Sequence, residues 1–259
     1  DHKLIAQYGE KKRIPLEYHA FPPTLVQAFI SAEDDRFFHH PGVDYKGLLR
    51  AVITLARTGE RRQGGSTITM QVARNFFLSR KKTYLRKLNE IFLSLKIERE
   101  LSKQDILALY LNKIFLGYRS YGVAAASQVY YGKPLSELTL AQHAMIGGLP
   151  KAPSAYNPIA NPKRAKTRRN YVLKRMLELG YITQEEHDTS AAEPVTAKIH
   201  GQKIEAYAPY ISEMVRAFMV EKYGDDAMVG GFQVYTTVKT DLQYAARAAL
   251  RKALIDYEM

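Results

Sequence analysis

The sequence contains no cysteine and no tryptophan. The lack of cysteine excludes a disulfide framework and a metal site built on thiolates, although it does not fix the cellular compartment. No run of apolar residues reaches the roughly 18 that indicate a membrane-spanning helix. The glycine-rich phosphate-binding loop of many nucleotide-hydrolysing proteins is missing as well.

The composition is that of an ordinary globular protein with a large positive charge. Of 259 residues, 46% are hydrophobic and 25% are charged, which is enough for one large core or two lobes. Lysine and arginine number 38 against 26 acidic residues, so the net charge is +12. This surplus predicts a polyanionic partner: nucleic acid, an anionic membrane surface or a phosphate-bearing substrate. The chain begins at Asp1 without a visible signal peptide, so we expect it to be part of a longer protein.

The segment 31–42 carries two adjacent carboxylates, Glu33 and Asp34, at the predicted end of a helix. Prolines at 22 and 23 and a helical apolar period mark the start of this helix, and a proline at 41 limits its end. A carboxylate near a helix C-terminus, beside a second carboxylate and the rings of Phe37 and Phe38, should hold its proton more firmly than usual. Such a group suits a general base, but a solvated helix end explains the same residues equally well.

A second helix is predicted to begin at Ser66, which follows two glycines and is a good N-cap. The free N–H groups and positive dipole of such a helix end can bind an anion. Arg74 falls on about the same face of this helix as Gln71. An ordinary capped helix with an arginine facing water is the alternative.

The range 83–99 predicts another helix, in which Glu90 lies one turn beyond Arg86 and Lys87. These cations should keep Glu90 ionised. Simple pairing on the surface explains the spacing equally well. The apolar residues predicted to form the buried face of this helix are Leu85, Leu88, Phe92 and Leu95.

The rest of the chain also indicates mainly helices. Further helices are predicted over 45–57, 102–117, 139–145, 161–180, 183–187 and 241–254. Short strands are predicted between residues 3 and 16 and over 232–238. A loop rich in proline and glycine occupies 147–158.

Four separate segments resemble the peptidoglycan glycosyltransferase domain of class A penicillin-binding proteins. They are Glu33-Asp34-x-x-Phe37-x-x-His40-x-Gly42, the range 63–75, Arg86-Lys87-x-x-Glu90, and the range 110–117 with Tyr121-Gly122. The proline loop at 148–158 is similar to the last motif of that family. The order and spacing of these motifs make the resemblance specific, and it extends more weakly over nearly the whole chain.

The resemblance implies a mainly α, lysozyme-like domain with two lobes and a cleft over residues 1–200, with short β elements near both ends of the chain. Residues 201–259 would begin a linker toward a transpeptidase domain that is missing here. The implied activity is polymerisation of lipid II into β-1,4-linked glycan with inversion and release of undecaprenyl pyrophosphate. Glu33 would be the general base, and Glu90 would assist near the leaving pyrophosphate. No cofactor is required, although Glu90 could act through a divalent cation, Mg²⁺ or Mn²⁺.

The resemblance also implies substrate-binding residues and partners. The residues are Asp34, Phe37, His40, Ser66, Thr67, Gln71, Arg74, Asn75, Lys82, Arg86 and Lys87. The partners are lipid II, the growing glycan strand, the membrane surface and phosphoglycolipid inhibitors such as moenomycin, without nucleic acid. The location would be the outer face of the bacterial cytoplasmic membrane, with an N-terminal transmembrane anchor absent from this chain.

Two positions depart from the family pattern. Met70 stands where a second glutamine is common, and Arg74 stands where lysine is usual. Arginine keeps the charge but binds phosphate as a fork, so we expect activity with altered affinity. Phe76, Phe77 and Leu78 could enter a membrane, but the pattern slightly favours a place in the core.

Two rival interpretations remain. A lysozyme-type, glycan-cleaving enzyme would also use a glutamate in a helical cleft, but the basic cluster suits phosphate better. A nucleic-acid-binding module could use the basic helix at 163–175, but no known nucleic-acid motif is present. The S-x-x-K pattern at 79–82 is a chance match, because the other transpeptidase motifs do not follow it.

Overall fold

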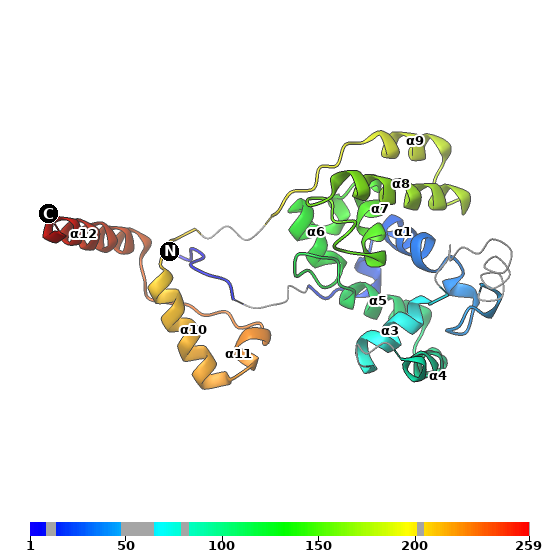
Figure 1. Cartoon of the computed structure of the whole chain (residues 1–259), viewed down its shortest axis with the longest axis horizontal. Coiled ribbons are helices and arrows are strands. Elements are labelled where there is room, and N and C mark those ends of the chain that lie inside the picture. Colours follow the sequence, from blue (N-terminus) through cyan, green and yellow to red (C-terminus); the bar gives the residue numbers. More distant parts are fainter. Residues whose placement is uncertain (9–13, 48–64, 79–82, 201–204, 259) are drawn as a thin grey trace. The chain divides into compact units, whose positions relative to one another are not determined.

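The computed structural model describes residues 1–8, 14–47, 65–78, 83–200 and 205–258 (Figure 1). Contacts within the chain divide it into two compact units. One unit spans residues 12–200, and the other combines residues 1–11 with 201–259. The role of 201–259 as a linker stays a prediction.

The described residues of both units are mainly helical, which confirms the predicted mainly α class. In the larger unit these are η1 (Tyr18–Ala20), α1 (Pro23–Glu33), η2 (Phe37–His39), α3 (Ile68–Phe77), α4 (Tyr84–Glu100), α5 (Lys103–Lys113), α6 (Val123–Tyr131), η3 (Leu135–Glu137), α7 (Leu140–Gly148), η4 (Leu149–Lys151), α8 (Pro162–Glu178) and α9 (Gln184–Ala192). In the other unit they are α10 (Pro209–Tyr223), α11 (Asp226–Val229) and α12 (Thr240–Glu258).

The helices begin largely where hydroxyl caps predict. Ser102, Thr139 and Thr183 each form a capping box at the start of α5, α7 and α9. The predicted cap at Ser66 is wrong by one residue. Thr67 is the N-cap of α3, and its side chain accepts a hydrogen bond from the backbone N of Met70 at 3.2 Å.

The helices of the larger unit pack in two groups. In one group α1 packs on α7 and α8, and α9 packs on α8. In the other group α3 packs on both α4 and α5. Gly147 on α7 permits the close approach to α1, because an added Cβ would stand 3.1 Å from Cβ of Ala28. This division agrees with the predicted two-lobed, lysozyme-like class.

The predicted buried face of α4 is wrong. Leu85, Leu88 and Phe92 are 68%, 48% and 61% exposed, whereas Glu90 and Ser94 are buried. The physical reason is that acidic side chains on the polar face of α4 form hydrogen bonds and ion pairs inside the protein. Phe76 and Phe77 on α3 are exposed as well, so the preference for a core position was also wrong.

The described residues contain no β-strand, only an isolated bridge between Phe115 and Tyr121. The segments 3–8, 14–16 and 232–238 were predicted as strands, but they have no ladder of backbone partners and the prediction is wrong there. Residues 45–47 are helical, while the rest of the helix predicted over 45–57 lies outside the described residues. In the described part of the chain, no helix combines the length and the apolar character that a membrane crossing needs.

Candidate active site

Glu33 is the last residue of α1, and its carboxylate meets side chains from two other helices. Its side chain is only 13% exposed. Nε2 of Gln71 on α3 donates a hydrogen bond to Oε2 of Glu33 at 3.0 Å. A guanidinium nitrogen of Arg168 on α8 lies 3.7 Å from Oε1. The interpretation as a solvated helix end is therefore wrong.

Burial raises the pKa of the Glu33 carboxyl above its ordinary value, and the nearby charge of Asp34 raises it further. The hydrogen bond from Gln71 and the positive charges of Arg168 and Lys151 act in the opposite direction. The raised pKa agrees with the direction expected for a general base. Its largest cause is desolvation by the fold rather than the helix end or the neighbouring carboxylate.

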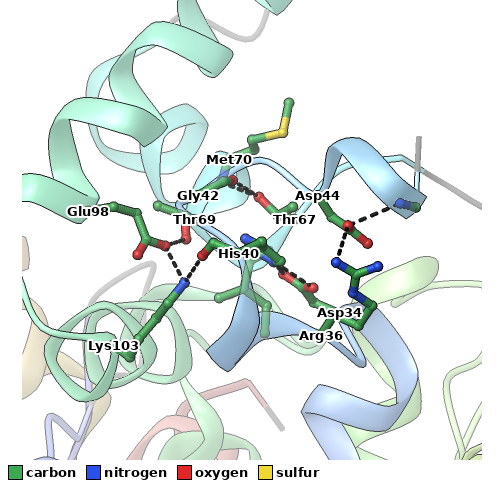
Figure 2. Close-up of polar contacts among 12 residues, drawn as sticks. Asp34, Arg36, His40, Gly42, Asp44, Thr67, Thr69, Met70, Glu98 and Lys103 are labelled. Carbon is green, nitrogen blue, oxygen red and sulfur yellow. Dashed lines mark hydrogen bonds and ion pairs between the residues drawn. The ribbon is translucent and has the colours of Figure 1, made fainter. Parts of the chain in front are cut away.

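Asp34, the neighbour of Glu33, is buried and connects three segments (Figure 2). Nε2 of His40 donates to the two carboxylate oxygens at 2.9 and 3.1 Å. The backbone N of Ile68 donates to Oδ2 at 2.9 Å. Asp34 thus joins the end of α1 to the 37–44 loop and to the first turn of α3.

Three more predicted substrate-binding residues face into the protein. Phe37 is fully buried, and His40 and Thr67 are nearly so. Oγ1 of Thr67 donates to the carbonyl oxygen of Gly42 at 2.5 Å, which holds the loop against α3 (Figure 2). In this structure these side chains bind neighbouring segments, and direct contact with substrate stays a prediction.

Glu90 lies inside a cluster of cations. Its side chain is 1% exposed, and its oxygens form ion pairs with Arg86 and Lys87. Nζ of Lys87 is 2.9 Å from Oε2 of Glu90 and also donates to Oγ of Ser66 at 2.6 Å. Because Glu90 is buried, the alternative of ordinary surface pairing is wrong.

Lys87 has an unusual proton affinity for a lysine. Desolvation, followed by the charges of Arg74 and Arg86, lowers its pKa to about 8. The adjacent carboxylate of Glu90 opposes this effect. A cluster with this excess of positive charge is a fitting site for an anionic phosphate group.

The surroundings of Glu90 do not fit a divalent cation. Its carboxylate oxygens already pair with Arg86 and Lys87, which would repel a metal ion. Among the described residues, no group of three or more histidines and carboxylates could hold a metal. The reaction proposed below therefore contains no step through Mg²⁺ or Mn²⁺.

Helix α3 connects the two carboxylate sites. Gln71 binds Glu33, and Arg74, three residues later on the same helix, lies near Lys87. Asn75 is exposed on α3, and Lys82 lies outside the described residues. The structure therefore brings most of the predicted polar residues to one region.

Arg168 is a residue of this site that sequence reasoning missed. It is only 7% exposed, its Nε donates to the carbonyl oxygen of Gly148 at 3.2 Å, and its guanidinium lies 4.6 Å from the ring centre of Tyr171. The sequence shows a basic helix at 163–175, but no local signal separates this arginine from its neighbours. Arg169 on the same helix is 1% exposed and is therefore not available to a nucleic acid, whereas Lys163 and Arg164 are exposed.

Tyr110 was named in a motif, but the structure adds that it lies near Glu33. It is 1% exposed, and burial followed by the charge of Glu33 raises the pKa of its hydroxyl well above the ordinary value. Its hydroxyl has no hydrogen-bond partner among the described residues.

Comparisons with known proteins identify relatives of this chain. Penicillin-binding protein 1A of Pseudomonas aeruginosa is 53% identical over 258 residues, covering 100% of this chain and 31% of that protein. The protein of the same name from Escherichia coli is 52% identical over 259 residues, covering 30% of its length. The chain therefore spans about a third of the length of these curated relatives.

The fold also matches a solved structure. The crystal structure of penicillin-binding protein 1A from Haemophilus influenzae superposes with a TM-score of 0.61 at 38% sequence identity, covering 98% of this chain and 28% of that one. The family model described as transglycosylase matches residues 1–177. Because this match covers more than half of the chain, the chain belongs to the transglycosylase family.

Proposed function

We propose that this chain is a peptidoglycan glycosyltransferase that polymerises lipid II into β-1,4-linked glycan with release of undecaprenyl pyrophosphate. The observation that carries the proposal is that the chain buries two glutamates in different surroundings. Glu33 has a raised pKa, and Glu90 is held by Arg86 and Lys87. Acid–base chemistry needs such a separation of environments.

In the proposed reaction, Glu33 takes the proton from the 4-hydroxyl of the acceptor lipid II. The freed oxygen attacks the anomeric carbon of the growing strand, and the bond from that carbon to the pyrophosphate oxygen breaks. The electron pair leaves with the pyrophosphate, the proton stays on Glu33, and attack from the opposite face inverts the configuration. Gln71 orients the carboxylate during this step.

The leaving pyrophosphate needs stabilisation of its charge more than it needs a proton donor. Lys87 can supply this stabilisation together with Arg86 and Arg74, because both arginines lie near the Lys87 ammonium, which also binds Ser66. A glycan-cleaving enzyme has no diphosphate to stabilise. The cation cluster therefore favours the transferase over the lysozyme-type alternative.

The proposed partners follow from the same chemistry and from exposed apolar side chains. The membrane surface would contact the exposed faces of α3 and α4, which carry Phe77, Leu85 and Phe92. Moenomycin-like phosphoglycolipids would compete for the cation cluster. In a full-length protein we place this chain on the outer face of the cytoplasmic membrane, between an N-terminal anchor and a C-terminal transpeptidase.

The test is a turnover assay with labelled lipid II, followed by digestion of the product with lysozyme. We expect Glu33→Gln to abolish polymer formation, by about a thousandfold or more for a lost general base, while the melting temperature stays close to that of the wild type. Retained polymerisation would remove Glu33 from the role of base. Product that lysozyme does not digest would contradict the proposed linkage.

A further inference from the structure

Lys103, the first residue of α5, makes a set of contacts that the proposed reaction does not explain (Figure 2). Its Nζ donates to Oε1 of Glu98 at 2.8 Å and to the backbone oxygen of His40 at 2.6 Å. The same ammonium lies 4.5 Å from the centre of the Phe37 ring. One cation therefore binds a carboxylate, a carbonyl and an aromatic ring, which come from two other segments.

Glu98 extends this contact to α3. Its Oε1 also accepts a hydrogen bond from Oγ1 of Thr69 at 2.5 Å, and its side chain is 8% exposed. The backbone of Gly42 presses against the same region of α4, with a φ of 90°. A Cβ at Gly42 would stand 2.8 Å from the carbonyl oxygen of Ser94 and 2.9 Å from Cγ of Glu98. The 37–44 loop, α3, α4 and α5 thus meet around the Lys103–Glu98 pair.

Two chains of contacts lead from Lys103 to Glu33. The first passes through His40, whose ring nitrogen binds Asp34, the residue next to Glu33. The second passes through Glu98 to Thr69 on the first turn of α3. That turn leads directly into Gln71, which donates to the Glu33 carboxylate.

The Lys103–Glu98 pair also affects the position of Glu90. Glu98 lies two helical turns after Glu90 on α4, so its bond to Thr69 fixes α4 relative to α3. Helix α3 carries Gln71 beside Glu33 and Arg74 beside the Glu90 cluster. Catalysis by groups on different helices depends on geometry, and a displacement of about 1 Å can cost roughly a hundredfold in rate.

We propose that Lys103, acting through Glu98 and His40, is a positioning residue that sets Glu33 against the Glu90 cation cluster. This inference rests on the proposed function for its link to turnover. Lys103 acts through other residues and contacts no reacting atom. Its loss should therefore lower kcat for lipid II more than it changes KM.

The experiment compares Lys103→Met, Lys103→Arg and the matched control Lys96→Met in the full chain. Lys96 is an exposed lysine of α4. We expect Lys103→Met to lower kcat by about tenfold or more, with KM within about twofold, as the loss of an orienting contact predicts. Lys103→Arg keeps the charge and should restore most of the rate, and Lys96→Met should match the wild type.

A second readout separates positioning from simple loss of folded protein. The groups that face Glu33 are Gln71, Asp34, Arg168, Lys151 and the hydroxyl of Tyr110. If Gln71 moves away, its pKa-lowering hydrogen bond to Glu33 is lost, so the acid limb of the kcat–pH profile should move to higher pH. A carboxyl ¹³C NMR titration, with Glu33 assigned from Glu33→Gln, should show the same direction without substrate.

The inference is overturned if Lys103→Met keeps the wild-type kcat, or if its loss equals the loss of folded protein while the titration of Glu33 does not move. An inactive wild-type chain would instead refute the proposed function. In that case the NMR titration still decides whether Lys103 positions Glu33, because it requires no turnover.

Discussion

At the scale of single residues, the contact between Arg168 and Glu33 has the most direct consequence for the proposed chemistry. Burial pushes the pKa of Glu33 upward, and a base that held its proton too firmly would be inactive at neutral pH. The positive charge of Arg168, whose guanidinium lies 3.7 Å from the carboxylate, limits that rise in the pKa of Glu33.

Replacing Arg168 by Met should therefore raise the pKa of Glu33 further. Because the base acts in its ionised form, the rate at acidic pH should fall about tenfold for each pH unit by which this pKa rises, and it should recover as the pH increases. The measurement is the pH dependence of lipid II polymerisation. Arg164→Met, at an exposed position one turn earlier on α8, is the control. An acid limb that stays in place would contradict the assigned role of Arg168.

Lys87 provides a second prediction at this scale, because its pKa is about 8 in the free protein. The ammonium is charged below this pH and loses its proton as the pH rises through it, so its contribution to phosphate binding should be present below pH 8 and disappear above it. Lys87→Arg should keep that contribution, since arginine stays charged.

The measurement is binding of inorganic pyrophosphate by calorimetry from pH 7 to alkaline pH. As the pH rises through the pKa of Lys87, the ratio of the affinity of Lys87→Arg to that of the wild type should rise by about tenfold. This is the change in affinity expected when one hydrogen bond to a charged group is lost. Using the ratio cancels the titration of pyrophosphate itself. A ratio independent of pH would show that Lys87 does not bind the anion through its charge.

At the scale of elements, α4 shows how a buried polar contact can reverse the orientation of a helix. Glu90 and Ser94 face inward, and the face carrying Leu85, Leu88 and Phe92 is exposed. An exposed apolar face of this kind marks an interaction surface more often than an accident of folding. In the proposed function its partner is the membrane.

Replacing both Leu85 and Phe92 by Ser should therefore weaken binding to vesicles of anionic lipid without lowering the melting temperature. The loss should be at least about tenfold, since each exposed apolar side chain that enters the bilayer contributes on the order of 1–3 kcal/mol. Co-sedimentation with vesicles measures this effect. Ile14→Ser, at another exposed apolar position of the same unit, is the control. Equal binding by the two variants would contradict the membrane assignment of α4.

At the scale of the whole molecule, the division into two units separates the candidate site from the segments at both ends. The candidate site residues all lie within 12–200. The first residues of the chain belong to the other unit and contact residues of its C-terminal part. The backbone N of Leu4 donates to Oε2 of Glu205 at 2.9 Å, and the backbone N of Thr240 donates to Oδ2 of Asp1 at 2.9 Å.

A chain of residues 12–200 should therefore fold on its own and unfold in one cooperative transition. The buried hydrophobic side chains form one cluster that includes Phe29 and Tyr110 and a second that includes Val172 and Met176, and both clusters lie inside this range. Thermal melting followed by circular dichroism measures this, with the full chain as the control. Its pyrophosphate affinity should match that of the full chain within about twofold, since the cation cluster also lies inside this range. A broad transition would contradict the division.

The sequence by itself determined most of the helices, most of their caps and the identity of the polar residues, although it did not predict α6, α10 or α11. Proline and hydroxyl caps predicted α1, α5, α7, α8 and α9, because these signals act within a few residues. Local periodicity could not show that Glu90, rather than Leu85 and Phe92, is buried. An amphipathic pattern records only which residues are apolar, and it does not show that Glu90 finds ion-pair partners inside the protein.

Only the tertiary structure decided the surroundings of each group. Arg168 faces Glu33 although the two residues are far apart in sequence, and Lys103 reaches His40 across 63 positions. No local pattern encodes such contacts. The motifs identified the glutamates, but their burial, and with it the proton affinity of Glu33, depends on helices brought together from distant parts of the chain.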